Sequence, residues 1–347
     1  MLVIAIIALI YCLNSLFQHY CRMINNMNSN LPSYNELPQV FAISLDGFNA
    51  ISLTGEEQTK YLQGQVTCDV NSLAQEKLLT GAHCNAKGKV FSAFRLIERN
   101  NGYLLLQPAS SIEQSLAELK KFGVFAKVEI SQANDINYLA IAGSQANAKM
   151  AELFSQVPDT LTPVIQQETT TLVYLAGAVD RYLIIDSKDN LAKISSNFDF
   201  PIYDNSVWQL LEIAEGFPIL SQQYIAEYVP QMLNLQAING ISFTKGCYLG
   251  QETVARMQYL GKNKRALFAL TGNAVNANTG DIIEKKLGEN WRKAGDVLAV
   301  YQADDKQTYI QAILANDIDE STELRIKEHH TGLTISPLPY NISSDAE

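Results

Sequence analysis

The sequence is short of positive charge and of paired cysteines. Lys and Arg number 26 against 36 Asp and Glu, which gives a formal net charge of −10. Coating of nucleic acid through a general basic surface is therefore excluded, and any contact with RNA has to be local. Five cysteines are scattered over 347 residues without CxxC spacing, so neither a disulfide framework nor a zinc motif is indicated. These shortages favour a cytoplasmic, reducing compartment.

Apolar residues are plentiful, at 47% of the chain against 18% charged. A chain of this length and composition is expected to fold into about two or three domains with a substantial core. Residues 1–17 form an uncharged, mostly apolar run. The run has no positive n-region and no small-residue cleavage site, and it is shorter than the roughly 20 residues of a membrane span.

Three interpretations of this N-terminal run stay open. It is a membrane anchor, a degenerate signal, or the product of a start codon placed too early, with Met23 or Met27 as the true start. We prefer the last, so contact with a membrane is expected only if the run is genuine. In all three cases residues 25–30 read as a polar linker.

From about residue 38 the pattern becomes that of a packed α+β protein. Apolar runs at 40–45 and 50–55 predict strands, and a helix is expected at 56–63. The turn at 85–89, between apolar runs, predicts a hairpin over 81–99. Strand, helix and strand then follow at 103–107, 111–121 and 126–130, and the alternation continues with strands at 138–142 and 181–185 and helices at 146–154 and 190–198. From 266 to 338, runs in which apolar and polar residues alternate favour a terminal β-barrel or sandwich.

The segment KGCYLGQE at residues 245–252 carries the strongest chemical signal. Gly246 and Gly250 permit backbone angles and close approaches that other residues forbid, so a ligand could lie against exposed amides at the start of a following helix. The same helix start, with Lys245 nearby, would lower the pKa of the Cys247 thiol. On pattern alone, an ordinary glycine turn with a buried Cys247 and a solvated Lys245 explains the segment at least as well.

The KGCYLGQE segment resembles the signature of the YgfZ family, the folate-binding relatives of the glycine-cleavage T-protein. The resemblance extends from about residue 38 to residue 339, through segments at 61–67, 82–89, 215–218, 230–235, 240–243, 261–265 and 288–292. It implies a three-domain aminomethyltransferase-like fold of the α+β class, with ferredoxin-like α/β sandwich domains and a C-terminal β-barrel. The implied division is an extension and linker at 1–37, a folate-binding domain at 38–137 with 205–262, a small α+β domain at 138–204, and the barrel at 263–340.

The resemblance also implies a folate, as tetrahydrofolate, in a central cavity. From the residues themselves no metal site is expected. The family's aromatic contacts fall on Phe48 and Trp208, although the family often has Trp at the first of these positions. A flat pteridine ring gains from aromatic stacking, and Glu215 and Glu252 would accept hydrogen bonds from its amino-pyrimidine edge. Alternatively, Trp208 is an ordinary core residue, and Glu215 and Glu252 are structural carboxylates on a polar face. The full set expected around the folate is Phe48, Trp208, Glu215, Lys245, Tyr248, Gln251, Glu252 and Arg256, with Cys247 as the candidate reactive thiol.

Whether the protein is an enzyme is left open by the sequence. The aminomethyltransferase relatives carry an acid shortly after the glycine turn at 87–89, where this chain has Ser92 and Ala93. Without that carboxylate, aminomethyl transfer loses its obvious helper at the folate nitrogen. The resemblance therefore implies a folate-binding accessory protein for iron–sulfur cluster assembly or repair and for tRNA processing. Its partners would be iron–sulfur enzymes such as a tRNA methylthiotransferase. The alternatives are a folate-dependent one-carbon transferase, and a module that contacts tRNA directly through residues 262–265.

Overall fold

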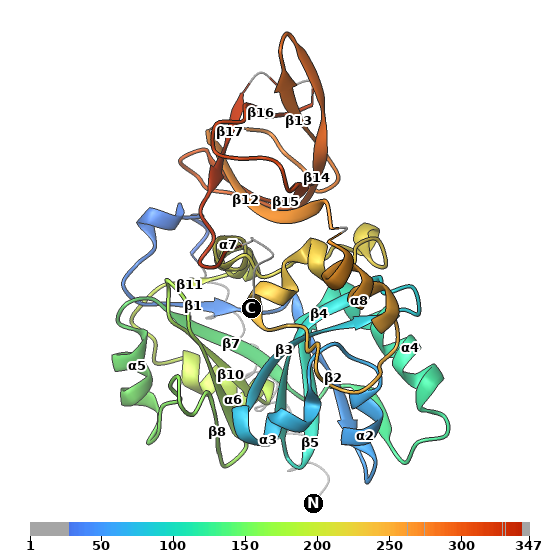
Figure 1. Cartoon of the computed structure of the whole chain (residues 1–347). Coiled ribbons are helices and arrows are strands. Elements are labelled where there is room, and N and C mark those ends of the chain that lie inside the picture. The colour runs from blue at the N-terminus through green and yellow to red at the C-terminus, as the bar shows by residue number, and fades with distance from the viewer. Residues whose placement is uncertain (1–27, 262, 274, 328, 330, 342–347) are drawn as a thin grey trace, which may run out of the picture.

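A computed structural model describes residues 28–341, except positions 262, 274, 328 and 330 (Figure 1). The apolar run at 1–17, with the three interpretations given to it, lies outside the described residues. Within the described part of the chain, no helix has both the length and the apolar character needed to cross a membrane.

A six-stranded sheet forms one half of the body, in the order β11-β1-β7-β10-β9-β8. Its strands are β1 (Phe41–Ser44), β7 (Asn137–Ala142), β8 (Val164–Gln167), β9 (Thr170–Leu175), β10 (Arg181–Asp186) and β11 (Ile202–Tyr203). The helices α5 (Ala146–Leu153) and α6 (Lys188–Ser195) contact β7 and β10, and α7 (Asn205–Glu215) contacts β1. Every residue of β10 is buried, including the charged Arg181 and Asp186 at its two ends, and the four residues between them form a short apolar run.

A five-stranded antiparallel sheet forms the other half, in the order β3-β4-β5-β2-β6. Its strands are β2 (Phe48–Thr54), β3 (Leu78–Cys84), β4 (Val90–Arg99), β5 (Gly102–Pro108) and β6 (Glu129–Gln132), and the helices of this half are α2 (Gln58–Gln63), α3 (Leu73–Glu76) and α4 (Ile112–Gly123). Successive side chains of β5 enter different cores. Leu105 packs with residues of α2 and α4, whereas Leu104 and Leu106 share a core with the first sheet and α7.

A closed six-stranded barrel sits above the two sheets (Figure 1, orange and red). Its strands are β12 (Arg265–Asn273), β13 (Ile282–Leu287), β14 (Asn290–Gln302), β15 (Gln307–Ala315), β16 (Leu324–Ile326) and β17 (Gly332–Ser336). The connection from α7 to the barrel contains α8 (Gln251–Leu260) and the short 3-10 helices η4 (Gln222–Tyr224), η5 (Pro230–Leu233) and η6 (Leu235–Ile238), while η1 (Tyr34–Glu36), η2 (Val70–Ser72) and η3 (Ala109–Ser111) occur earlier. The side chain of Gln209 on α7 donates to the Val300 carbonyl at 2.8 Å, so this helix joins the barrel to the sheets.

Residues 28–37, here called the N-terminal strap, connect the first sheet to the barrel. The amide of Asn28 donates to the Ile202 carbonyl at 2.8 Å. Further along, the amide of Tyr34 donates to the Tyr309 hydroxyl at 2.9 Å, and the Tyr301 hydroxyl donates to the Pro32 carbonyl at 2.7 Å. The strap therefore holds two parts of the molecule that are far apart in sequence.

The expected α+β class and terminal barrel are confirmed, as is the hairpin over 81–99. The predicted helix at 56–63 begins two residues later, at Gln58. The predicted strands at 40–45 and 50–55 both form, but β1 and β2 belong to different sheets. The proposed domain boundaries stay a prediction, and a division by sheets would group β1 with the strands of 138–204.

Candidate functional site

The KGCYLGQE segment lies against the turn between β3 and β4. Gly250 caps α8 with a φ of +85°, and a Cβ built on it would lie 2.4 Å from the Asn85 carbonyl oxygen. A Cβ on Gly88 would likewise lie 2.9 Å from the Thr253 Cβ. The amide of Leu249 donates to the Gly64 carbonyl at 3.0 Å. Glycine is therefore required where the segment and the turn meet, because a side chain would fill the space that the opposing backbone occupies.

Cys247 is the exposed member of the three cysteines that the structure describes; Cys68 and Cys84 are buried. Burial raises the pKa of the Cys68 thiol to about 12, which keeps it protonated and unreactive near neutral pH. Cys247 lies four residues before the first residue of α8, so it is outside the first turn, where the helix dipole acts most strongly. The role of Cys247 as the reactive thiol stays a prediction.

Lys245 is buried, contrary to both readings of this residue from the sequence. Its ammonium donates to three backbone carbonyls, those of Gln63 and Val66 at 2.8 Å and that of Cys68 at 2.6 Å. Burial lowers the pKa of Lys245 to about 8. Because its three N–H donors are all engaged, Lys245 anchors the segment to residues 63–68. In this structure the ammonium is engaged by backbone, and its expected part in a ligand site stays a prediction.

The remaining predicted residues of the segment divide between core and surface. Tyr248 is buried, and the Lys245 Nζ lies 5.2 Å from its ring centroid. Glu252 and Arg256 are exposed and form an ion pair at 3.1 Å along one face of α8. Gln251, at the helix start, is partly buried. Their folate contacts stay predictions.

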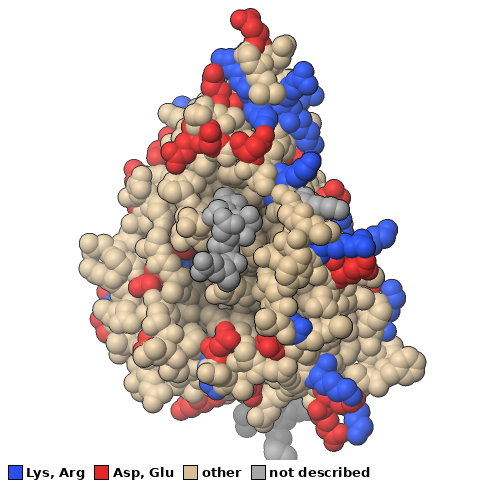
Figure 2. All heavy atoms as spheres, viewed as in Figure 1, with Lys and Arg blue, Asp and Glu red and all other residues tan. Residues whose placement is uncertain are grey.

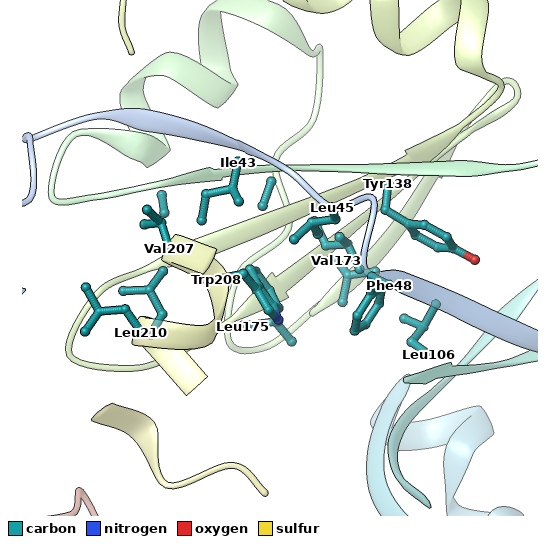
Figure 3. Close-up of a cluster of buried hydrophobic side chains, with 14 of the residues drawn as sticks. Ile43, Leu45, Phe48, Leu106, Tyr138, Val173, Leu175, Val207, Trp208 and Leu210 are labelled. Carbon is teal, nitrogen blue, oxygen red and sulfur yellow. The ribbon is translucent and has the colours of Figure 1, made fainter. Parts of the chain in front are cut away.

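A cavity of about 340 Å³ lies beside α7, away from the KGCYLGQE segment. Phe48 and Trp208 both line it, with ring centroids 6.0 Å apart and an interplanar angle of 64° (Figure 3). The Asp204 side chain caps the helix by accepting from the Ser206 amide at 2.8 Å, which places Trp208 in the second turn. This space is called the Trp208 cavity. Its lining is Gly47, Phe48, Arg95, Pro108, Ala109, Ser110, Asn205, Trp208, Gln209, Glu212, Phe217, Pro218, Ile219, Leu220, Ser221, Thr279, Leu298 and Ala299.

Two buried arginines share one carboxylate at the Trp208 cavity. Arg95 Nη2 donates to both oxygens of Glu212, at 2.9 and 3.1 Å, and Arg181 Nη1 donates to Glu212 Oε1. Burial lowers the pKa of the Arg95 guanidinium. Sequence reasoning missed this cluster, although a charged residue inside an otherwise apolar strand or helix was a usable signal.

The predicted site residues thus fall into three places. Phe48 and Trp208 meet in the cavity, whereas no residue from 245 to 256 is among its lining residues. Glu215 is elsewhere, where its carboxylate accepts from the Ala178 amide at 2.8 Å. In the described part of the chain, no three His, Cys, Asp or Glu side chains converge as a metal site would require.

The arrangement of the two sheets and the barrel defines the fold class of the protein. A crystal structure of the glycine cleavage system aminomethyltransferase T from Bartonella henselae superposes with a TM-score of 0.67, covering 87% of this chain and 86% of that one at 13% identity. The fold is aminomethyltransferase-like.

Sequence comparisons identify the family. Residues 263–329 match the family model described as YgfZ, beta-barrel domain. The tRNA-modifying protein YgfZ of Colwellia psychrerythraea strain 34H is 59% identical over 319 residues, which is 92% of this chain and 98% of the relative. The protein of the same name from Yersinia enterocolitica is 42% identical over 315 residues, which is 90% of this chain and 95% of that relative. The chain belongs to the YgfZ family.

Proposed function

We propose that this protein is a cytoplasmic, folate-binding accessory protein that supports tRNA modification and the assembly or repair of iron–sulfur clusters. The observation that carries the folate claim is the Trp208 cavity, which presents two aromatic rings in an aminomethyltransferase-like fold. Its volume of about 340 Å³ lies within the range of small-molecule sites. The tRNA role is supported by the names of the relatives.

Tetrahydrofolate suits the residues of this cavity. Its flat rings would pack against Phe48 and Trp208, since aromatic pairs prefer offset or edge-to-face contacts. Trp208 and Phe48 already stand edge to face at 6.0 Å, which leaves ring surface for a ligand on the cavity side. When bound, the folate would supply one-carbon or redox chemistry, and the protein's part is to bind and orient it.

Cys247 is the second part of the proposal. Its exposure makes the thiol accessible to another protein, and the contact with residues 85–88 fixes the backbone that presents it. We assign its partners to the class of iron–sulfur enzymes, such as a tRNA methylthiotransferase.

A folate-dependent transferase is less well supported. Ala93 is buried, and the hydroxyl of Ser92 lies 3.4 Å from that of Ser115 on α4. Glu212 is the one carboxylate among the described residues that line the Trp208 cavity, and two arginines already occupy it. The described lining residues therefore offer no carboxylate that is free to act as a general base.

Direct contact with tRNA through residues 262–265 would use the exposed side chains of Lys264 and Arg265. Basic side chains do gather along one flank of the face shown in Figure 2, from the barrel toward α8. However, Arg265 lies 4.0 Å from Asp296. A gel-shift titration at several salt concentrations tests this point, and salt-sensitive binding lost on replacing Lys264 and Arg265 would support direct contact.

The folate claim is tested by titration of the purified protein with tetrahydrofolate. Since the chain has two tryptophans, Trp291→Phe leaves Trp208 as the single fluorescent reporter. Saturable quenching is expected, and replacing Phe48 by Ala should weaken binding by about tenfold through loss of ring contact. A flat response from folded protein, confirmed by calorimetry, would remove the folate claim.

The thiol claim is tested by Cys247→Ala in cells that lack the native protein. We expect loss of methylthiolated tRNA with normal amounts of soluble variant, because the side chain is exposed and its removal costs little stability. Gly246→Ala is the matched control, as a Cβ there meets nothing within 4 Å. Full rescue by Cys247→Ala would make the cysteine dispensable.

A further inference from the structure

We propose that one flank of α4 is the interface of a symmetric dimer, in which α4 packs antiparallel against α4 of a second copy of this chain. The inference concerns assembly and goes beyond the proposed function. The flank consists of six residues whose helical spacing places them on one side of α4. These residues, called the α4 flank, are Ala109, Glu113, Leu116, Ala117, Lys120 and Val124.

The first observation is the position of the α4 flank in the molecule. The helix α4 lies on the outer side of the five-stranded sheet (Figure 1). Five of the six flank residues line an open hollow of about 330 Å³, together with Ile112 and with Gln132 of β6. β6 is an edge strand of the sheet, and sheet edges are places that proteins commonly cover.

The second observation is the exposure of apolar side chains at the end of the flank. Val124 is 70% exposed and keeps helical backbone angles, with φ −56° and ψ −31°, so it continues the line of the helix. Next to it, Phe125 is 99% exposed, and Phe122 is 43% exposed. Apolar side chains gathered in water are typical of a surface that meets another molecule.

The third observation is that two charges of the flank have no partner. Within the described part of the chain, the side chains of Glu113 and Lys120 form neither an ion pair nor a hydrogen bond. They are seven residues apart, about 10 Å along the helix, which is too far for them to pair with each other. The neighbouring Lys121, by contrast, pairs with Glu118 at 3.4 Å.

The fourth observation is that the flank is complementary to itself. Its spacings of four, three, one, three and four residues are symmetric about the midpoint between Leu116 and Ala117. Read from either end, the residue types are apolar, charged, apolar, apolar, charged and apolar, and the two charges are of opposite sign.

A twofold axis through this midpoint therefore satisfies the whole flank. In a symmetric dimer, if one residue contacts a second, the second contacts the first in return. Antiparallel packing thus places Glu113 opposite Lys120 of the second copy, and Lys120 opposite its Glu113. At the axis Leu116 meets Ala117, a pairing of a large and a small side chain that lets two helices approach closely.

These features favour a second copy over other occupants. A helix that lies on a lipid surface has a broad apolar face and concentrates Lys and Arg on its polar face, whereas here one acid and one base lie on the flank itself. An unrelated protein would not require the two halves of the flank to mirror each other. Because α4 has 12 residues, about 18 Å of contact, the interface is small and the dimer is expected to be reversible.

The experiment measures the association of the full chain by analytical ultracentrifugation at concentrations up to about 1 mM. The wild-type protein is expected to pass reversibly from monomer to dimer. Ala117→Asp should weaken association by at least about a hundredfold, because it brings two carboxylates together near the axis. Ala117 is exposed, so the variant should fold. Ala151→Asp, the same change at an exposed position of α5, is the matched control and should associate like the wild type.

Exchange of the two charges tests the antiparallel order. Glu113→Lys and Lys120→Glu should each weaken association by about tenfold, since each places like charges opposite one another twice. The variant that carries both changes should associate like the wild type, and a mixture of the two single variants should form a mixed dimer. Loss in the single variants without recovery in the double variant would overturn the inference.

The remaining outcomes are equally decisive. A wild-type chain that stays monomeric at about 1 mM overturns the inference, and so does a dimer that survives Ala117→Asp. If the monomer instead binds phosphatidylglycerol vesicles and loses that binding in Ala117→Asp, the flank faces a lipid surface and the inference fails. If circular dichroism shows that Ala117→Asp does not fold, the charge exchange decides.

Discussion

His83 shows how one side chain can control the response of this protein to acid. It is fully buried, and its Nδ1 lies 2.9 Å from the Ser115 hydroxyl of α4. Its Nε2 has no hydrogen-bond partner among the described residues. Burial lowers the pKa of His83 to about 3, so the imidazole is neutral in the folded protein at all but strongly acidic pH.

The first prediction concerns pH. The unfolded chain binds a proton at His83 near pH 6.5, whereas the folded chain does so only near pH 3. Between these values the unfolded state holds more protons, so stability falls as the pH falls. Relative to His83→Gln, the free energy of unfolding of the wild type should drop by up to about 1.4 kcal/mol per pH unit below 6.5. Urea titrations at pH 7.5, 6 and 5 check this, and parallel curves for the two proteins would contradict it.

The second prediction concerns the shared carboxylate. Glu212→Gln removes the carboxylate that the buried guanidinium groups of Arg95 and Arg181 share, and a loss of about 3–5 kcal/mol in unfolding free energy is expected. Arg95→Met leaves a balanced pair and should cost less. Chemical denaturation of both variants measures the difference. Equal losses would show that charge balance does not govern this cluster.

The sequence predicted some of these residues and missed others for a physical reason. KGCYLGQE is contiguous and unusual in composition, so it could be recognised directly. The Arg95–Glu212 pair joins positions 117 residues apart, and Arg181 joins Glu212 from 31 residues away. Nothing local to Arg95 indicates which carboxylate it meets, because tertiary packing makes that choice.

At the scale of elements, the contact between the KGCYLGQE segment and the β3–β4 turn decides where Cys247 lies. Gly250 is held at φ +85° against the Asn85 carbonyl, and this contact orients the start of α8. The hairpin itself was predictable from its turn sequence. The contact was not, because it needs two distant turns to meet.

The third prediction uses two glycines of the same segment. Gly250→Ala should cost more than about 1 kcal/mol, since it combines an unfavourable φ with a Cβ 2.4 Å from a backbone oxygen. Gly246→Ala should change stability by less than about 0.5 kcal/mol, because nothing lies within 4 Å of its Cβ. Urea unfolding measures both, and the rate of Cys247 labelling by a thiol reagent should change only in Gly250→Ala. The same cost for both variants would show that the segment is not fixed by this turn.

At the scale of the whole molecule, the N-terminal strap joins the sheets to the barrel. The alternation of apolar residues predicted the individual strands and the barrel, but not that β1 and β2 would enter different sheets. The two strands are separated by only three residues, 45–47. Both strands are apolar, and the partners that distinguish them come from residues 137–203 and from 102–132.

The fourth prediction compares two shortened chains, one that begins at Asn28 and one that begins at Asn35. The shorter chain loses the hydrogen bonds of the strap to Ile202, Tyr301 and Tyr309, at about 1 kcal/mol each. Its melting temperature is expected to be lower by about 2–4 °C per kcal/mol lost, with faster proteolysis near the barrel. Identical melting of the two chains would show that the strap contributes nothing to stability.

Glu212 also constrains when the interior of the protein can close during synthesis. Arg95 belongs to one sheet and Arg181 to the other, and both leave the ribosome before the residue that neutralises them. Until α7 has been synthesised, two like charges face the same region, so water has to remain between the nascent sheets. Closure of the interior therefore waits until α7, which ends at Glu215, has been made, and a pause placed just before that helix would prolong the interval in which a chaperone can bind the open chain.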